Sequence, residues 1–491
     1  MANDPHNLAR TVQLSPGATQ GYTHAGTQTE ESAQKASELL TLNHARYHVR
    51  WSHTFHNHIA HHLLTIWALG ASPEVIQAMF DYNTPYQDPS ERPHTAVSTY
   101  RDLQDPAVFG RCLGEHDCYV DFLRFFEDEV AEKGVPAVIN EYLLKGDERA
   151  DDLFGRMHAD LMHPIIHLGC GLEFSQPSIV AEALAQGCIH PNWPKTFLRA
   201  TEEHIRSNRD PDPDRDGDMP APSTPILEIL DSMRRDRAIA DAVRDADGLN
   251  KIPDGLLKRV PADYLARHHL GRFRVAPAPA ELRRKTAEMV YTSAYVLGAA
   301  QRPGKREKLD FVALHCVTLA VFYPAMLHEL AWLTDAQKAR LLEAKVRVDA
   351  VVYAGCGCPA LYPERITEYV PRRPADGWPE LVRRAVVYRD EGHAAKLIRA
   401  LLCLEQLAEP VPDGFPIAKR DFIKIAHMAM DSIEAALEPG GSTMPEEAAR
   451  AMTESVGRGG EMIAKNMKRW VYYNGLESAW QYVPAKGEPR A

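Results

Sequence analysis

Histidines are the residues of this sequence with the most chemical potential, and several are spaced to act together. The chain has 22 histidines, and the stretch Trp51–Gly70 alone holds His53, His56, His58, His61 and His62. On a helix, His58 is three residues from His61 and four from His62, so either pair places two imidazoles on one face, with Cβ atoms roughly 5–6 Å apart. Such a pair fits two ligands of one metal ion, or one ligand and its hydrogen-bond partner. Histidines that only bond within a polar helix face are the alternative, but the apolar run that follows favours a functional site.

Two further histidine segments lie in apolar surroundings. His163 and His167 are four residues apart, and Gly169 and Gly171 behind them predict either a close approach of another backbone or the end of a helix. His315 lies inside an otherwise apolar helix, where an unpaired imidazole costs about 1–3 kcal/mol and therefore needs a partner. In both segments a hydrogen-bonded core histidine is the alternative to a metal ligand.

The fourth segment pairs His393 with Lys396, which are three residues apart and share one face of a predicted helix. An ammonium group has no lone pair and cannot bind a metal ion. Burial beside a cation favours the neutral amine, and a neutral amine reacts with carbon dioxide to form a carbamate. Histidines combined with such an oxygen ligand match the ligation of non-haem iron oxygenases. The alternative is an exposed Lys396 that pairs with Glu391.

Helical periodicity dominates the elements that must position these residues. Apolar residues recur at three- and four-residue intervals in residues 30–48, 56–69, 119–133, 153–167, 177–187, 226–242, 281–300, 310–330, 335–352, 379–407, 419–437 and 445–470. Alternating strand patterns with hairpin turns are almost absent. The sequence therefore predicts an all-α protein, a single large multi-helical domain with long surface loops.

The chain has three regions by composition. Residues 1–30 are polar and predict a flexible N-terminal segment, whereas residues 31–480 form the expected helical domain. The stretch 207–224 is acidic and rich in proline, which is typical of a solvated loop. Because histidine segments occur on both sides of this loop, it is expected on the surface of one domain and not between two.

Bulk composition excludes several classes of protein. The net charge of −11 and the lack of a basic stripe argue against nucleic-acid binding. The N-terminus has no apolar stretch of the kind that signal peptides carry. The apolar run Phe311–Leu327 is shorter than a span of about 20 residues and predicts a buried core helix, hence no membrane span. Eight scattered cysteines without a C-x-x-C pair are typical of reduced thiols, and we expect a cytoplasmic protein.

In their order along residues 45–400, the four histidine segments resemble the questin oxidase-like family of fungal aromatic-polyketide tailoring enzymes. The motifs that carry the resemblance are His58-x-x-His61-His62, His163-Pro-Ile-Ile-His167, His315-x-Val-Thr318 and Gly392-His393-x-x-Lys396. Each motif is weak by itself, and the ordered set is fairly specific.

The resemblance implies an Fe(II)-dependent, non-haem oxygenase that uses molecular oxygen to cleave a carbon–carbon bond of an anthraquinone-type aromatic polyketide. It also implies an iron site formed by these histidines and the lysine, and it leaves open which of His58, His61 and His62 binds the metal directly. We expect one iron held by His58 or His62 together with His167, His315, His393 and a carbamylated Lys396. His61, the remaining histidine of the first motif, is then expected to accept the phenol proton of the substrate.

Three other functions fit the sequence less well. A flavin- or NADPH-dependent Baeyer–Villiger oxidase is disfavoured because no G-x-G-x-x-G motif follows a strand. A zinc hydrolase lacks the H-E-x-x-H pattern. A non-catalytic helical scaffold is disfavoured because the sequence has no internal repeat.

Overall fold

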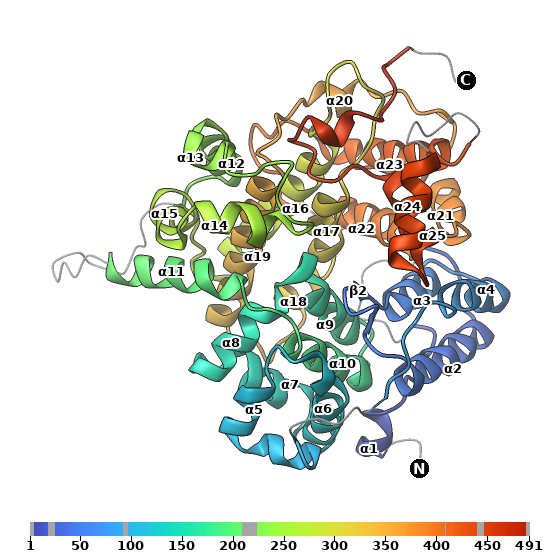
Figure 1. Ribbon diagram of the computed structural model, residues 1–491, viewed down its shortest axis with the longest axis vertical. Coiled ribbons are helices and arrows are strands. Elements are labelled where there is room, and N and C mark those ends of the chain that lie inside the picture. The colour runs from blue at the N-terminus through green and yellow to red at the C-terminus, as the bar shows by residue number, and fades with distance from the viewer. Residues whose placement is uncertain are drawn as a thin grey trace. The chain divides into compact units, whose positions relative to one another are not determined.

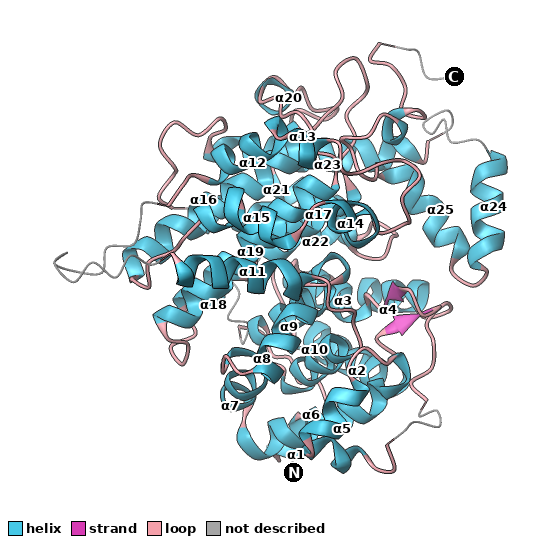
Figure 2. Ribbon diagram, turned by 60° about the vertical axis from the view of Figure 1, so that its left-hand side comes forward, coloured by secondary structure: helices cyan, strands magenta, loops and turns pink. Residues whose placement is uncertain are grey.

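The computed structural model describes residues 4–17, 25–91, 97–208, 223–407, 409–438 and 446–487. Among them, strands occur only in one short antiparallel hairpin, β1 (Arg50–Trp51) with β2 (Phe55–His56), and most of the remaining elements are helices (Figure 2). The predicted all-α class is confirmed. The hairpin differs from the prediction. The helix predicted for residues 56–69 begins only at Ile59, and His56 lies in β2 instead.

Contacts group the chain into two compact units, each built from separate stretches. Unit 1 comprises residues 1–192, 375–403 and 445–466, and unit 2 comprises residues 193–374, 404–444 and 467–491. The chain enters each unit repeatedly, so the predicted loop at 207–224 does not separate two consecutive domains. Residues 209–222 of that loop lie outside the described residues.

Unit 1 contains the N-terminal helices and two later pairs of helices (Figure 1). Its helices are α1 (Pro5–Leu8), α2 (Glu30–Arg46), α3 (Ile59–Ala68), α4 (Pro73–Asn83), α5 (Pro106–Cys112), α6 (Tyr119–Lys133), α7 (Val135–Ile139), α8 (Glu148–Met157), α9 (His163–Glu173), α10 (Pro177–Cys188), α21 (Trp378–Val386), α22 (His393–Leu407), α24 (Glu446–Val456) and α25 (Gly460–Arg469). The last residues of α22 and α25 belong to unit 2.

The centre of unit 1 is the packing of α9 against α10 and α3, with α6 behind α10 and α2 against α3 and α4. Gly171 makes the α9–α10 contact possible, because a Cβ atom there would lie 2.8 Å from the backbone nitrogen of Val180. The close backbone approach predicted from the glycines is therefore confirmed at Gly171. The alternative, a helix end directly after His167, is wrong because α9 continues to Glu173.

Residues 4–17, part of the segment expected to be flexible, pack onto unit 1. The side chains of Ala9 and Val12 are buried. The amide of Val12 donates to Thr41 Oγ1 at 3.0 Å, and that of Gln13 donates to Gln176 Oε1 at 2.8 Å. This part of the predicted flexible segment is therefore held in place. A few buried apolar side chains and specific hydrogen bonds are enough to order a polar segment.

Unit 2 is also helical. Its helices are α11 (Pro194–Ser207), α12 (Ile226–Arg235), α13 (Arg237–Ala240), α14 (Leu257–Arg259), α15 (Ala262–His268), α16 (Pro279–Ala299), α17 (Phe311–Ala320), α18 (Tyr323–His328), α19 (Asp335–Gly355), α20 (Glu364–Thr367) and α23 (Phe422–Ala436). The stretch Phe311–His328 is long and apolar enough to cross a membrane, but 83% of it is buried inside the protein, as expected of a core helix. All eight cysteines of the chain are buried and free.

Candidate metal centre

The hairpin β1–β2 leads directly into α3 and fixes the first histidine of the site. His58 is the residue before the first turn of α3. Asn57 holds this entry in place: its Oδ1 accepts from the amide of Ile59 at 2.9 Å, and its Nδ2 donates to Asn43 Oδ1 at 2.9 Å. His58 is buried, with 6% of its surface exposed.

The second histidine follows a strained turn. Asp160, Leu161 and Met162 have φ values of 44°, 57° and 61°, a left-handed conformation that costs non-glycine residues of order 1–3 kcal/mol each. Arg50 binds the carboxylate of Asp160 at 2.5 Å and helps to hold the turn. The turn directs His163, the first residue of α9, so that its Nδ1 lies 2.6 Å from the carbonyl oxygen of Asp160.

The third contribution comes from the start of α22. The carboxylate of Asp390 accepts from the amide of Gly392 at 2.6 Å and from that of Ala394 at 2.9 Å, which caps the helix. Gly392 has a φ of 86°, and a Cβ atom there would lie 2.6 Å from Cγ of His62. Glycine at this position therefore lets the start of α22 lie directly against α3 and brings His393 to the site.

His58, His163 and His393 form one buried group. One ring nitrogen from each lies within 4.8 Å of the others, which is close enough for all three to bind a single ion. The rings of His58 and His393 meet edge to face, with centroids 4.8 Å apart. No residue of this group is more than 6% exposed.

The contact between His58 and His163 is the most informative feature of the group. Their Nε2 atoms are 2.9 Å apart. His163 donates its Nδ1 proton to a backbone carbonyl, and His58 donates its Nδ1 proton to the Glu391 carboxylate at 2.8 Å. In neutral imidazoles both Nε2 atoms then carry lone pairs, which repel each other unless a cation lies between them. Two ligands bound at right angles to one ion at about 2.1 Å would be about 3 Å apart, as these atoms are.

The electrostatics of the group keep His58 neutral. Burial lowers the pKa of His58 well below its ordinary value, and the charges of Lys396 and His393 act in the same direction. Burial also lowers the pKa of Lys396 to about 8, although Asp390 and Glu391 oppose this shift. The second carboxylate oxygen of Glu391 accepts from Asn466 Nδ2 at 2.7 Å. The site therefore offers a neutral imidazole at His58 and, at Lys396, an amine with a lowered pKa.

His61 and His167 form a hydrogen-bonded pair beside this group. Their Nε2 and Nδ1 atoms, respectively, are 3.0 Å apart, and the centroid of the His61 ring is 5.7 Å from that of His58. His167 Nε2 lies 2.6 Å from Oε2 of Glu182. Because both ring nitrogens of His167 take part in these hydrogen bonds, the structure does not favour it as a direct ligand.

The roles predicted for His62 and His315 stay predictions. His62 lies against Gly392, and burial lowers its pKa to about 4; its Nε2 has no hydrogen-bond partner among the described residues. His315 is buried on α17 in unit 2, where its Nδ1 lies 2.7 Å from the carbonyl oxygen of Phe311.

A second potential ligand group consists of His56, Asp160 and His190. The Nε2 atoms of His56 and His190 are 2.8 Å apart, and His190 Nδ1 lies 2.6 Å from the carbonyl oxygen of Gln186. His56 has no such constraint on its other nitrogen, so an Nε2 proton on His56 makes this contact an ordinary hydrogen bond. The guanidinium of Arg50 on Asp160 also disfavours a cation there.

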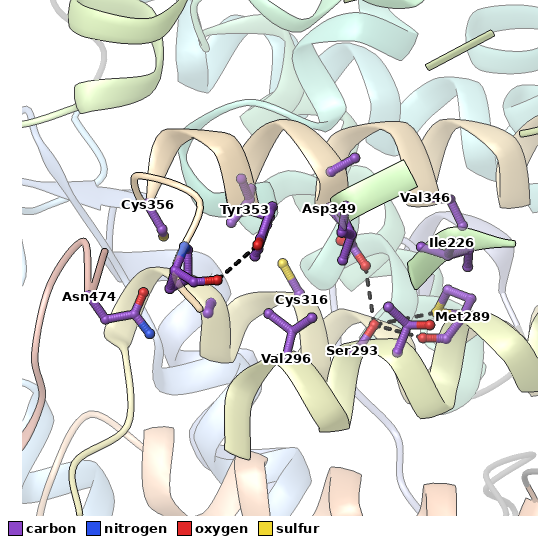
Figure 3. Close-up of a pocket in the computed structure, with 16 residues that line it drawn as sticks. Ile226, Met289, Ser293, Val296, Cys316, Val346, Asp349, Tyr353, Cys356 and Asn474 are labelled. Atoms are coloured by element: carbon purple, nitrogen blue, oxygen red, sulfur yellow. Dashed lines mark hydrogen bonds between the residues drawn. The ribbon is translucent and has the colours of Figure 1, made fainter. Parts of the chain in front are cut away.

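Unit 2 contains a separate pocket, between α12, α16, α17 and α19 (Figure 3). Most of its lining is apolar, and Asp349 is its main charged residue. The carboxylate of Asp349 accepts from Ser293 Oγ at 3.2 Å and pairs with Lys345. Burial raises the pKa of Asp349 despite this lysine.

The positions of three residues in the candidate site do not follow from the sequence. The spacing of His163 and His167 is visible in the sequence, but only the hydrogen bonds of the two rings distinguish them as candidate ligands. The sequence suggests Glu391 only as a partner for Lys396, whereas in the structure its carboxylate lies 2.8 Å from His58 Nδ1. Glu182, the partner of His167, carried no signal in the sequence, because an isolated glutamate in an apolar helix is more often an ordinary ion-pair partner.

Comparisons with known proteins agree with the motifs. A family model described as "Questin oxidase-like" matches residues 55–401. The chain is 44% identical to "Oxidoreductase AflY" of Aspergillus parasiticus, covering 96% of this chain and 93% of that protein. It is 35% identical to "Questin oxidase" of Aspergillus fumigatus, over 94% and 95% of the two chains. It is also 35% identical to "Baeyer-Villiger oxidase ptaJ" of Pestalotiopsis fici, over 87% and 94%.

Proposed function

This chain belongs to the questin oxidase-like family, and we propose that it is an Fe(II)-dependent oxygenase that opens a ring of an anthraquinone-type polyketide. The relative named questin oxidase supports the substrate class. The observation that carries the metal dependence is the pair of lone-pair nitrogens, on His58 and His163, that face each other at 2.9 Å.

We assign the direct ligands to His58, His163 and His393, with a carbamate on Lys396 as the oxygen ligand. Imidazole nitrogens combined with one carboxylate-like oxygen suit ferrous iron. When bound, the iron would supply the redox chemistry with oxygen that no amino-acid side chain provides. Glu391 and the carbonyl of Asp160 orient the His58 and His163 rings, as hydrogen-bond partners of ligating histidines do.

Lys396 is suited to form a carbamate because burial lowers the pKa of its amine to about 8. A lower pKa means that a larger fraction of the amine is neutral at neutral pH than in an ordinary lysine. Only the neutral amine reacts with carbon dioxide, so its chemistry favours this modification at neutral pH.

The remaining residues of the site handle protons and exclude water. His61 lies beside the metal group and is positioned to accept the phenol proton of a bound hydroxyanthraquinone, which makes the ring more electron-rich. Buried aliphatic residues of α3 and α9, such as Leu63 and Ile166, keep bulk water away from the group.

Metal analysis of the freshly purified protein and four variants tests this proposal. We expect about one iron per chain in the wild type and its loss in His58→Ala, His393→Ala and Lys396→Ala. His158→Ala is the matched control, because His158 is a fully buried histidine of the same unit whose Nδ1 lies 2.8 Å from a backbone carbonyl. Iron retained in His393→Ala, or full activity of a metal-free protein, would rule the proposal out. Full iron in Lys396→Ala would refute the carbamate alone.

A second candidate is a Baeyer–Villiger oxidase that depends on NADPH or a flavin, and the names of several relatives favour a Baeyer–Villiger reaction. Oxygen uptake with questin as the substrate separates the two reactions. The iron oxygenase consumes oxygen without added NADPH, whereas the second candidate requires the reductant. The zinc hydrolase is distinguished by the same metal analysis, which would find zinc and no oxygen uptake.

A further inference from the structure

A continuous series of ionisable side chains leads from the candidate metal centre to the protein surface. Its members are His61, His167, Glu182, His44 and Glu127, followed by Arg10. They are supplied by α3, α9, α10, α2 and α6 and by the segment after α1, all within unit 1. We call these residues the histidine–glutamate series.

Direct hydrogen bonds of 3.0 Å or less join the residues of the inner part. His61 Nε2 and His167 Nδ1 are 3.0 Å apart, and His167 Nε2 lies 2.6 Å from Glu182 Oε2. The other carboxylate oxygen of Glu182 lies 2.6 Å from His44 Nδ1. These side chains are at most 6% exposed.

The outer part reaches solvent. His44 Nε2 lies 3.0 Å from Glu127 Oε1, and Glu127 Oε2 accepts from Arg10 Nε at 2.8 Å. The side chain of Glu127 is 8% exposed and that of Arg10 is 46% exposed. Glu127 is therefore where the series meets water.

The charges along the series are defined by its hydrogen bonds. Burial opposes the charge of His44, but its bonds to Glu127 and Glu182 outweigh this and raise its pKa to about 9. Burial likewise opposes the charge of Glu182, but His167 and His44 lower its pKa to about 2. Tyr119 also faces these carboxylates, and burial together with their charges raises its pKa, so its hydroxyl stays neutral.

Packing alone does not account for this arrangement. A buried carboxylate and imidazolium cost more in lost hydration than apolar side chains of the same volume, and replacing such groups with apolar residues is often neutral or stabilising. Five secondary-structure elements contribute one ionisable residue each, in an order that joins the site to solvent without a gap.

We propose that the histidine–glutamate series conducts protons between His61 and the surface, releasing one proton at Glu127 when His61 takes one from the bound substrate. This proposal rests on the proposed function for the source of the proton. Of these residues only His61 is expected to contact the substrate. The others act through His61 and are positioning residues.

The transfer balances in protons and charge. A proton that arrives on His61 Nδ1 sends the Nε2 proton to His167 Nδ1, and His167 sends its own Nε2 proton to Glu182. Neutral Glu182 no longer stabilises the imidazolium of His44, which gives its Nε2 proton to Glu127 and thence to water. The reverse sequence returns a proton to His61, so a deprotonation followed by a reprotonation of the substrate restores the series.

A substrate-free measurement tests whether the series is coupled. In full-length protein with ¹⁵N-labelled histidine, we expect His44 to be an imidazolium at pH 7. Glu127→Gln removes one of the two charges that stabilise it, so His44 should lose its proton at lower pH, and the ¹⁵N shifts of His167 should change with the same midpoint. The matched control is Glu129→Gln, a buried glutamate of the same helix that bonds Tyr142 and Lys133 outside the series. If His167 does not follow His44, the proposal is wrong, whatever reaction the protein catalyses.

Turnover provides the functional test in the same variants. With questin and oxygen, we expect Glu127→Gln and His44→Asn to keep their iron, to lower kcat by about tenfold or more, and to increase the solvent deuterium isotope effect. Added formate or imidazole should restore part of the rate in Glu127→Gln, which a purely structural defect would not allow. Unchanged kcat and isotope effect in a folded Glu127→Gln protein would overturn the proposal. If that variant does not fold, the same outcomes apply to His44→Asn.

Discussion

The role of each histidine at this site depends on the hydrogen-bond partners of its two ring nitrogens. His163 and His167 have the same spacing and similar surroundings in the sequence, yet only His163 keeps a lone pair directed at His58. His167 donates to Glu182 and belongs to the proton path. A histidine is a ligand or a proton carrier according to its tautomer, and a partner from a distant segment sets the tautomer.

The pH dependence of stability provides a test at this scale. His44 has a folded pKa raised to about 9 from an ordinary value near 6.5, so its stabilising contribution is complete below about pH 6.5 and is lost as the pH rises to 9. We therefore expect the difference in Tm between the wild type and His44→Gln to shrink steadily between pH 6.5 and 9, as measured by calorimetry.

The matched control for this measurement is His48→Gln. Burial lowers the pKa of His48 to about 3, so its contribution changes only below about pH 6.5, where the unfolded chain takes up the proton. The Tm difference for His48→Gln should stay constant between pH 6.5 and 9. A constant difference for His44→Gln over the same range would mean that His44 is not an imidazolium in the folded protein.

At the scale of elements, the start of α22 determines whether the site forms. Three consecutive residues have separate roles there: Asp390 caps the helix, Glu391 orients His58, and Gly392 lets α22 approach α3. The motif Gly392-His393 is visible in the sequence, but the need for a glycine is not. A Cβ atom at residue 392 would clash with His62, which lies more than 300 residues earlier in the chain.

Gly392→Ala tests this role. The new Cβ atom would lie 2.6 Å from His62 Cγ, and the φ of 86° is unfavourable for alanine. We expect a loss of about 1–2 kcal/mol from the backbone and about 1–3 kcal/mol more from overpacking, together with reduced iron content. Urea unfolding and metal analysis measure the two effects.

Gly146→Ala separates the two contributions, because Gly146 has a similar φ of 79° but nothing within 4 Å of the added Cβ atom. This control variant should lose only the backbone contribution and keep its iron. Equal destabilisation of the two variants would show that contact with His62 is unimportant.

At the scale of the whole molecule, unit 1 is built from stretches of chain that are far apart in the sequence. The N-terminal stretch supplies His58 and His163, and the stretch 375–403 supplies His393 and the buried Arg399. Arg399 Nη1 donates to Glu173 on α9 at 3.0 Å. The site therefore needs both stretches.

A chain of residues 1–192 alone should consequently fail to form the site. It lacks His393, and it leaves the buried Glu173 without its cation, a defect that costs about 3–5 kcal/mol. We expect lower helicity by circular dichroism and no stoichiometric iron. A well-folded fragment that binds iron as the full chain does would contradict this account of the ligand set.

The sequence by itself determined the all-α class, most of the helices and the segments that carry the site, because helical periodicity and histidine spacing are local properties. It also carried the family motifs. It did not determine which histidines face one another, why Gly392 is a glycine, or that Glu182 and His44 continue from His167 towards the surface. Those features depend on contacts between residues that are distant in sequence. Neighbouring groups decide which ring nitrogen of a histidine carries a lone pair and whether a buried side chain is charged. Only the tertiary structure brings those groups together.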